Sequence, residues 1–316
     1  RRPVLHPWAK FGDFDTKHYP DYKMLTDLLA GSLIVMPTEF LHGLYDGGHG
    51  AGLEDYWRAM RASKNSAGGF LWVFADEGVQ RADMNHAIDV AGNNAPDGIV
   101  GPFREKEASF HTIKELWSPV QLPKVLPAGF DGTLPVENRY EMSHLSRCKF
   151  RWQLRRFSTS DSTVLEEGTQ PGPETDAGLT GSLQLGLPTG WREKNADALA
   201  VTAIDWNERE LWTWVYPLKP QSESIPQGKP LDPGQGLKTG GTELRVEPDT
   251  GSLLGVTVEG REFSLRGGPI PDAKWQALDS GWFKLGYSVD PAVQTAVVGV
   301  AFDYPEEKMV KKTWLG

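Results

Sequence analysis

The sequence has 316 residues, of which 39% are hydrophobic, and it carries a formal net charge of -9. That length predicts two or three domains with cores of their own. The acidic balance and the lack of lysine and arginine clusters argue against a nucleic-acid partner. No run approaches the roughly 20 apolar residues of a membrane helix, so a membrane partner is not expected either.

Cys148 is the single cysteine, which excludes an internal disulfide and a cysteine-rich metal cluster. The chain begins at Arg1 without a recognisable targeting signal and reads like the middle of a structure. We therefore expect a truncated N-terminus, which leaves the localisation unknown. Twelve tryptophans are many for this length. Tryptophan faces stack on the apolar C–H surfaces of sugars, but they fill β-sandwich cores more often.

Residues 1–118 alternate between apolar runs of strand length and segments with helical spacing. We expect strands at Pro3–His6, Asp15–Tyr19, Leu33–Met36 and Gly69–Ala75, helices at Tyr22–Ala30, Leu53–Ala62 and Glu105–Trp117, a glycine-rich loop at Tyr45–Gly50, and an irregular stretch from Asp76 to Pro102. Strands buried on both faces between amphipathic helices indicate a parallel sheet. Four of them amount to about half of an eight-stranded barrel. The prediction is the C-terminal part of a (β/α)8 TIM barrel, its later strands.

After Pro119 the apolar residues alternate with period two, which is typical of antiparallel strands. The segments that show it are Lys149–Arg155, Leu199–Ile204, Leu211–Tyr216, Thr242–Val246, Val256–Val258 and Thr295–Phe302. The basic run Arg151–Arg156 reads as the solvated face of one such strand. Pro217–Gly236 is rich in proline and glycine and predicts a linker. We expect an immunoglobulin-like β-sandwich over 119–222 and the start of a large, incomplete C-terminal β-sandwich over 237–316.

Polar and aromatic side chains follow the predicted barrel strands, where catalytic groups of such barrels lie. They are His6, Trp8, His18, Tyr19, Glu39, Trp72 and Asp76. A carboxylate at Glu39 could attack an anomeric carbon if a second carboxyl group, about 5–5.5 Å away, protonated the leaving oxygen. On spacing alone, an ion-paired or helix-capping glutamate is the commoner case. By the same standard His42 would be a structural histidine and Asp76 part of a solvated helix start.

The segment around Glu39 has a recognisable pattern. Met36–Gly43 reads Met-Pro-Thr-Glu-Phe-Leu-His-Gly, and glycines, the pair Tyr56-Trp57 and then Gly68–Trp72 follow it. In order and spacing this resembles glycoside hydrolase family two, which holds β-galactosidases, β-glucuronidases and β-mannosidases. The β-galactosidase branch is the most similar. Its nucleophile strand reads Glu, aromatic, small residue, His, and a Tyr-Trp helix and a Gly-Gly-Phe-x-Trp strand come after it.

The resemblance implies roles for individual residues. Glu39 matches the nucleophile, His42 a histidine that contacts sugar hydroxyls, and Trp72 the aromatic floor of the sugar subsite. Tyr19 matches a tyrosine that touches the nucleophile. His18 and Asp76 complete the expected substrate-binding set because of their places at strand ends. The resemblance extends over nearly the whole chain, through Arg2-Pro3-Val4, Asp97–Val100, Glu137–Tyr140 and Gly241–Gly267.

Three departures from the family pattern bear on function. The family's acid/base glutamate stands in an Asn-Glu pair on an earlier strand, and no such pair precedes Glu39; Asn207-Glu208 lies in the β region. Val73 replaces an acidic residue that often follows the tryptophan, and the loop Tyr45–Gly50 differs from the usual turn. The resemblance also implies magnesium or sodium, without assignable ligands. The chemistry itself requires no cofactor.

These observations favour a fragment of a retaining exo-β-glycosidase that is inactive alone. Its expected partners are a carbohydrate substrate, the remainder of the same polypeptide and a second copy of the chain, because a half barrel leaves strand edges exposed. Three alternatives stay open. The chain could bind or scaffold carbohydrate without cleaving it, act on β-glucuronides or β-mannosides, or serve only to pack subunits through residues 119–316.

Overall fold

The computed structural model describes residues 6–43, 47–89, 91, 97–157, 162–219, 228–232, 236–268, 274–288 and 302–303. The chain divides into two compact units, each described by itself. One comprises Arg1–Gln153, Glu167–Thr189 and Ala200–Tyr216, and the other comprises Leu154–Glu166, Gly190–Leu199 and Pro217–Gly316.

The first part of the chain forms short parallel strands, as predicted. The strands are β1 (Phe14–Asp15), β2 (Ile34–Val35), β3 (Phe40–His42) and β4 (Leu71–Trp72). β1 pairs with β2 and β3 pairs with β4, both in parallel. Further parallel bridges join His18 to Glu39, Val35 to Ser66 and Ala75 to Val100. Four consecutive segments of the chain therefore run side by side in the same direction.

Three helices pack against these strands. They are α1 (Tyr22–Leu29), α2 (Gly47–Ala62) and α3 (Ala108–Leu116). Asp21 caps α1, since its carboxylate accepts a hydrogen bond from the backbone N–H of Met24 at 2.7 Å. The shared core consists of Leu25, Leu29, Val35, Phe40, Leu53, Tyr56, Met60 and Ile113. The helical spacing predicted for α1 and for residues 53–62 is confirmed by this burial.

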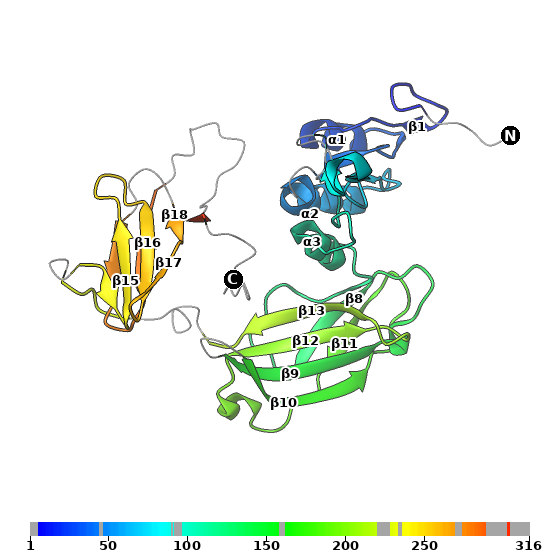
Figure 1. The fold of residues 1–316 in the computed structure, drawn as a ribbon. Coiled ribbons are helices and arrows are strands. Elements are labelled where there is room, and N and C mark those ends of the chain that lie inside the picture. Colours follow the sequence, from blue (N-terminus) through cyan, green and yellow to red (C-terminus); the bar gives the residue numbers. More distant parts are fainter. Residues whose placement is uncertain are drawn as a thin grey trace. The chain divides into compact units, whose positions relative to one another are not determined.

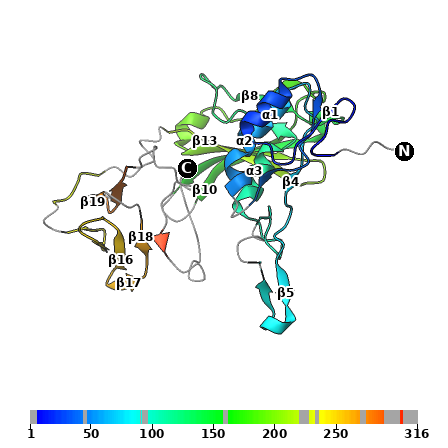
Figure 2. The ribbon, with the colours of Figure 1, turned by 90° about the horizontal axis from the view of Figure 1, so that it is seen from above.

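Several expectations for this part are wrong in detail. Helix α2 begins at Gly47, so the glycines expected in a loop form its first turn. The stretch from Asp76 to Pro102 is not irregular throughout, because β5 (Val79–Arg81) and β6 (Ala87–Asp89) form an antiparallel hairpin around the 3-10 turn Ala82–Met84. Figure 2 shows this hairpin extending away from α2 and α3.

The strand predicted at Gly69–Ala75 is shorter and more exposed than expected. Only Leu71–Trp72 is a strand, and Phe70 and Phe74 are 59% and 64% exposed. The predicted strand Pro3–His6 lies mostly outside the described residues. Within the described ranges the parallel strands do not close into a barrel. The parallel β/α arrangement is confirmed, and the TIM barrel stays a prediction.

From Val120 onward the structure is β-sheet, which is consistent with β-sandwich domains. One sheet has the strand order β10-β9-β12-β13 and another the order β11-β8-β7. Their strands are β7 (Val120–Gln121), β8 (Thr133–Asn138), β9 (Lys149–Phe157), β10 (Ser162–Pro171), β11 (Thr180–Gln184), β12 (Ala198–Ile204) and β13 (Glu210–Pro217). In β9, buried Phe150, Trp152 and Leu154 alternate with the less buried Arg151, Gln153 and Arg155, which confirms the half-buried strand. Short 3-10 turns lie at Leu145–Arg147 and Trp191–Lys194.

The last part of the chain forms a separate sheet with the strand order β14-β15-β16-β18-β21, and β17 pairs with β16 (Figure 1). Its strands are β14 (Lys238–Thr239), β15 (Thr242–Val246), β16 (Leu253–Val258), β17 (Arg261–Phe263), β18 (Arg266–Gly267) and β21 (Phe302–Asp303), and β19 (Lys274–Ala277) pairs with β20 (Phe283–Gly286). Most of the predicted strand Thr295–Phe302 and much of the predicted linker lie outside the described residues. The domain boundaries stay predictions.

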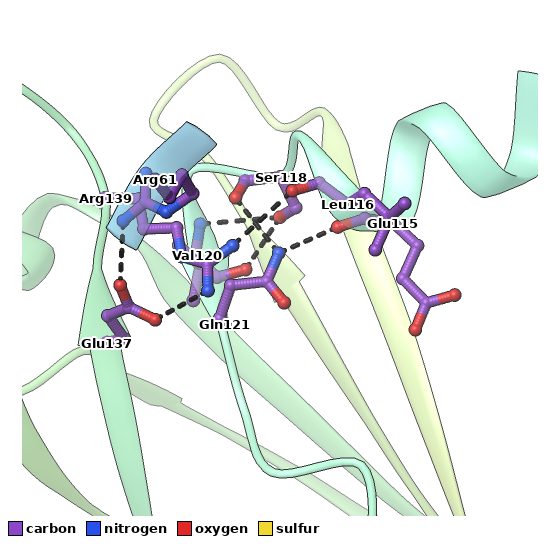
Figure 3. A network of polar contacts seen from close by, with 8 residues as sticks. All are labelled: Arg61, Glu115, Leu116, Ser118, Val120, Gln121, Glu137 and Arg139. Atoms are coloured by element: carbon purple, nitrogen blue, oxygen red, sulfur yellow. Dashed lines mark hydrogen bonds and ion pairs between the residues drawn. The ribbon is translucent and has the colours of Figure 1, made fainter. Parts of the chain in front are cut away.

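Polar contacts connect α2 to strand β8 and α3 to strand β7 (Figure 3). Glu137 of β8 binds Arg61 of α2 at 3.0 Å and Arg139 at 2.8 Å. The Gln121 amide donates to the backbone oxygen of Glu115, in the last turn of α3, at 2.7 Å. These contacts hold the connection between α3 and the sheet β11-β8-β7.

No helix in the described part of the chain is long and apolar enough to cross a membrane.

Candidate active site

Glu39 lies between β2 and β3, past the carboxyl end of β2 and directly before β3. Its side chain is 24% exposed, and its Oε2 atom lies 3.6 Å from Nε2 of His18. The backbone oxygen of Glu39 accepts a hydrogen bond from the Tyr19 N–H at 2.8 Å. The carboxylate is therefore held at the edge where the resemblance places a nucleophile, yet solvent can still reach it.

His18 connects the carboxylate to an aromatic surface. Its Nδ1 atom lies 3.3 Å from the hydroxyl of Thr38, the residue before Glu39. Its ring meets Tyr19 edge-on at 4.7 Å between centroids and Trp8 at 5.7 Å. Trp8 is 63% exposed, so one of its faces is open to solvent. The structure thus brings His18, Trp8 and Glu39 together, as expected from their strand ends.

Tyr19 contacts Glu39 through its side chain as well. Although Tyr19 is 36% exposed, desolvation of its phenol, a hydrogen bond to Glu39 and the charges of Glu39 and Asp97 raise the pKa of Tyr19 above its ordinary value. The phenol therefore stays protonated at neutral pH and can act as a hydrogen-bond donor to the Glu39 carboxylate. Tyr19 has a φ of 51° and Leu41 a φ of 54°, both in the left-handed region, which costs side-chain-bearing residues about 1–3 kcal/mol.

Trp72 and His42 share one buried partner, Asp97. The Trp72 indole N–H donates to Oδ2 of Asp97 at 3.1 Å, and Nε2 of His42 lies 3.6 Å from the same atom. The Asp97 side chain is 2% exposed, whereas that of His42 is 35% exposed. The His42 ring lies 5.8 Å from the Tyr19 ring, centroid to centroid. His42 therefore lies between the buried Asp97 carboxylate and the ring of Tyr19.

Asp97 is the site residue that sequence reasoning missed. In the sequence, Asp97–Val100 is only one of several stretches that carry the family resemblance. In the structure it is the fourth parallel segment, because the Val73 N–H donates to the Asp97 oxygen at 3.1 Å and Val100 bridges Ala75. The Asp-Gly pair was the available signal.

The Asp76 carboxylate forms a hydrogen bond with the backbone. Its Oδ1 atom accepts a hydrogen bond from the Gly98 N–H at 2.8 Å. This contact ties the third parallel segment to the fourth. A substrate contact for Asp76 stays a prediction. His6 is exposed and bridges Ala9, and Arg2-Pro3-Val4 lies outside the described residues.

The magnesium or sodium implied by the family resemblance finds no ligand set here. Among the described residues no three His, Cys, Asp or Glu side chains converge as a metal site would require. The metal ion implied by the resemblance therefore stays a prediction without ligands.

Comparisons with known proteins find weak structural similarity only. No family model and no curated protein matches it. Among solved structures it is similar to the exo-chitosanase CsxA of Amycolatopsis orientalis, with 11% identity over 75% of this chain and a TM-score of 0.27. A complex of a CsxA variant with PNP-beta-D-glucosamine has the same values. An inhibited exo-beta-D-glucosaminidase CsxA shares 12% identity at the same TM-score and coverage.

The chain spans 29–30% of the length of these structures. Similarity this low carries no conclusion about the activity of this chain.

Proposed function

We propose that this chain carries the nucleophile of a retaining exo-β-glycosidase, most like a β-galactosidase. The observation that supports this best is the setting of Glu39. Its carboxylate lies between β2 and β3, 3.6 Å from His18 and in contact with the Tyr19 phenol. A partly exposed carboxylate held by two side chains is preorganised for attack on one electrophile.

In the proposed first step, a Glu39 carboxylate oxygen attacks the anomeric carbon of the terminal sugar. A C–O ester bond forms, the glycosidic C–O bond breaks, and the leaving oxygen takes a proton from a general acid. Water then attacks the same carbon, releases Glu39, and gives its proton to the group that acted as acid. Two displacements retain the β configuration.

A wall made of the Trp72 and His42 rings has the chemistry to hold a sugar. The Trp72 indole offers an apolar face for the C–H surface of the ring. His42 offers a nitrogen to a hydroxyl, and the exposed Trp8 ring adds a second stacking surface next to His18. Orienting the anomeric carbon toward Glu39 is the contribution expected of these groups.

The general acid is not assigned. Asp97 is a carboxylate of the site, but it is 2% exposed and its Oδ2 atom receives the Trp72 N–H. A group so enclosed does not reach a leaving oxygen in the open site. The proposal therefore needs a carboxyl group from beyond the described residues.

A test of Glu39 can avoid the unassigned acid. A 2-fluoro-β-galactosyl fluoride releases fluoride without protonation, while the ring fluorine slows hydrolysis of the ester, so the sugar should accumulate on Glu39. Mass spectrometry of a digest should locate it there. Glu39→Gln should abolish labelling, and the exposed Glu141→Gln should not. Labelling elsewhere, or equal labelling of Glu39→Gln, would exclude this nucleophile.

A carbohydrate-binding protein without catalysis is the second candidate, favoured by the open Trp8 face. It predicts saturable binding of β-galactosides by the chain, no labelling, and the same affinity in Glu39→Gln. Matched glucurono- and manno-configured fluorides separate the three specificities within the enzyme proposal. Failure of all probes to bind or label would reject both candidates.

A further inference from the structure

The Asp97 carboxylate is buried at the base of the site, and its contacts are few. Its Oδ2 atom receives the Trp72 indole N–H at 3.1 Å and lies 3.6 Å from Nε2 of His42. Its Oδ1 atom is buried and has no hydrogen-bond partner within the part of the chain that the structure describes. A buried carboxylate is costly unless polar partners compensate it, so these two rings are central to keeping it there.

The backbone of Asp97 is fixed independently of its side chain. The Asp97 oxygen accepts from Val73, and the following N–H, of Gly98, donates to Asp76 at 2.8 Å. A Cβ at Gly98 would come within 2.3 Å of the backbone nitrogen of Asp76, so the two segments touch there. The carboxylate is thus anchored to the same strand segment that carries Trp72.

The two rings lie differently with respect to solvent. Trp72 is half-buried and fastened by its only polar atom, so rotation about its side-chain bonds would break the bond to Asp97. His42 reaches from the buried carboxylate to the Tyr19 ring, which itself contacts Glu39. The Asp97 carboxylate therefore contacts both rings, the Trp72 indole and the His42 imidazole.

We propose that Asp97 is a positioning residue that fixes the Trp72 indole and the His42 imidazole as one sugar-facing wall. Asp97 does not touch the sugar, because its carboxylate is enclosed. It acts by holding the apolar ring and the polar ring at a set separation, which favours ligands with an apolar C–H face and a hydroxyl at its edge. This ligand preference rests on the proposed glycosidase function, whereas the fixed position of the two rings does not.

The test follows the indole N–H of Trp72 by NMR in the 15N-labelled full chain. Trp72→Phe identifies the resonance. Asp97→Asn keeps an oxygen acceptor of the same shape and removes the charge, so the Trp72 resonance should shift upfield while that of buried Trp214 stays in place. Asp97→Ala removes the acceptor, and exchange of the Trp72 indole hydrogen with solvent should become at least tenfold faster.

An unchanged Trp72 resonance in Asp97→Asn would overturn the positioning role, and it does so even if Asp97→Ala does not fold. Binding of methyl β-galactoside gives the second readout. The affinity should fall about tenfold in Asp97→Ala and less in Asp97→Asn. If the parent chain binds no sugar while the resonance shifts as stated, the glycosidase proposal fails and the positioning role stands.

Discussion

His18 and Glu39 face each other across a parallel bridge, with His18 Nε2 3.6 Å from Glu39 Oε2. His18 comes from the segment after β1 and Glu39 from the segment after β2, so the pair depends on the register between two strands. Both side chains are partly exposed, 33% and 24%. The contact therefore orients the carboxylate in a setting where water still screens it.

Replacing His18 should slow labelling of Glu39 without unfolding the chain. We expect His18→Phe to lower the labelling rate by about two- to fivefold, because a polar contact at a partly exposed site is worth at most about 1 kcal/mol. Mass-spectrometric time courses with the galactosyl fluoride measure this rate. The exposed His111→Gln is the matched control and should label at the parental rate. Parental labelling of His18→Phe would show that the contact is incidental.

Glu137 should make folding sensitive to acid. Hydrogen bonding and charge from Arg139, together with Arg61, hold the pKa of Glu137 below its ordinary value. A depressed carboxyl pKa contributes stability above the ordinary pKa, about 4.3, and this is lost as the pH falls through the folded-state value. Because Glu137 is 34% exposed, we expect Glu137→Gln to cost about 0.5–1 kcal/mol at pH 7.

Urea unfolding of parent and Glu137→Gln between pH 7 and pH 3 checks this expectation. The two stability curves should converge on acidification, and salt should reduce the difference at pH 7. A constant gap at every pH would instead indicate a packing effect.

Tyr216 should make folding sensitive to alkali. It is 1% exposed, its hydroxyl donates to the Pro123 oxygen at 2.7 Å, and burial raises the pKa of its phenol above the ordinary value. A raised pKa contributes stability that is full below the ordinary value, about 10, and is lost as the pH rises toward the folded-state value. The free energy of unfolding should therefore fall above about pH 10.

Tyr216→Phe isolates this contribution. At pH 7 this substitution should lower the free energy of unfolding by about 1–3 kcal/mol, because the Pro123 backbone oxygen loses its hydrogen-bond donor. Above about pH 10 its stability should decline less steeply than that of the parent. Parallel declines in chemical denaturation would assign the alkaline loss to other groups.

Gly98 should not tolerate a side chain. An alanine Cβ would lie 2.3–2.6 Å from backbone atoms of Asp76, Ala75 and Val100, and backbone cannot yield as a flexible side chain does. We expect Gly98→Ala to cost about 3 kcal/mol or more and to displace Asp97.

Gly186→Ala is the control, since its added Cβ would have no atom of the described residues within 4 Å, apart from Gly186 and its two chain neighbours. Thermal unfolding should separate the two variants clearly, with Gly186→Ala close to the parent. Similar melting temperatures for both would contradict the close approach at Gly98. The Trp72 indole resonance reports in addition whether Asp97 has moved.

Much of the fold could be predicted because burial leaves a local pattern. The helical spacing of Leu25 and Leu29 and the alternation of Phe150, Trp152 and Leu154 follow from which face of each element is buried. The first turn of α2 and the β5–β6 hairpin were missed, since glycine and polar residues carry no comparable pattern.

Most helices and strands, and the place of Glu39 at the end of an apolar run, could be predicted from the amino-acid sequence, because periodicity and strand ends are properties of neighbouring residues. Which side chains meet at that strand end depends on how distant segments pair in the folded chain. Asp97 contacts Trp72 and His42 because parallel pairing brings separate chain segments into register, and that pairing depends on hydrogen bonds between backbones that any residue except proline can donate. For this reason the contacts of Asp97 are seen only in the folded structure, whereas Glu39 can be recognised as a candidate nucleophile in the sequence.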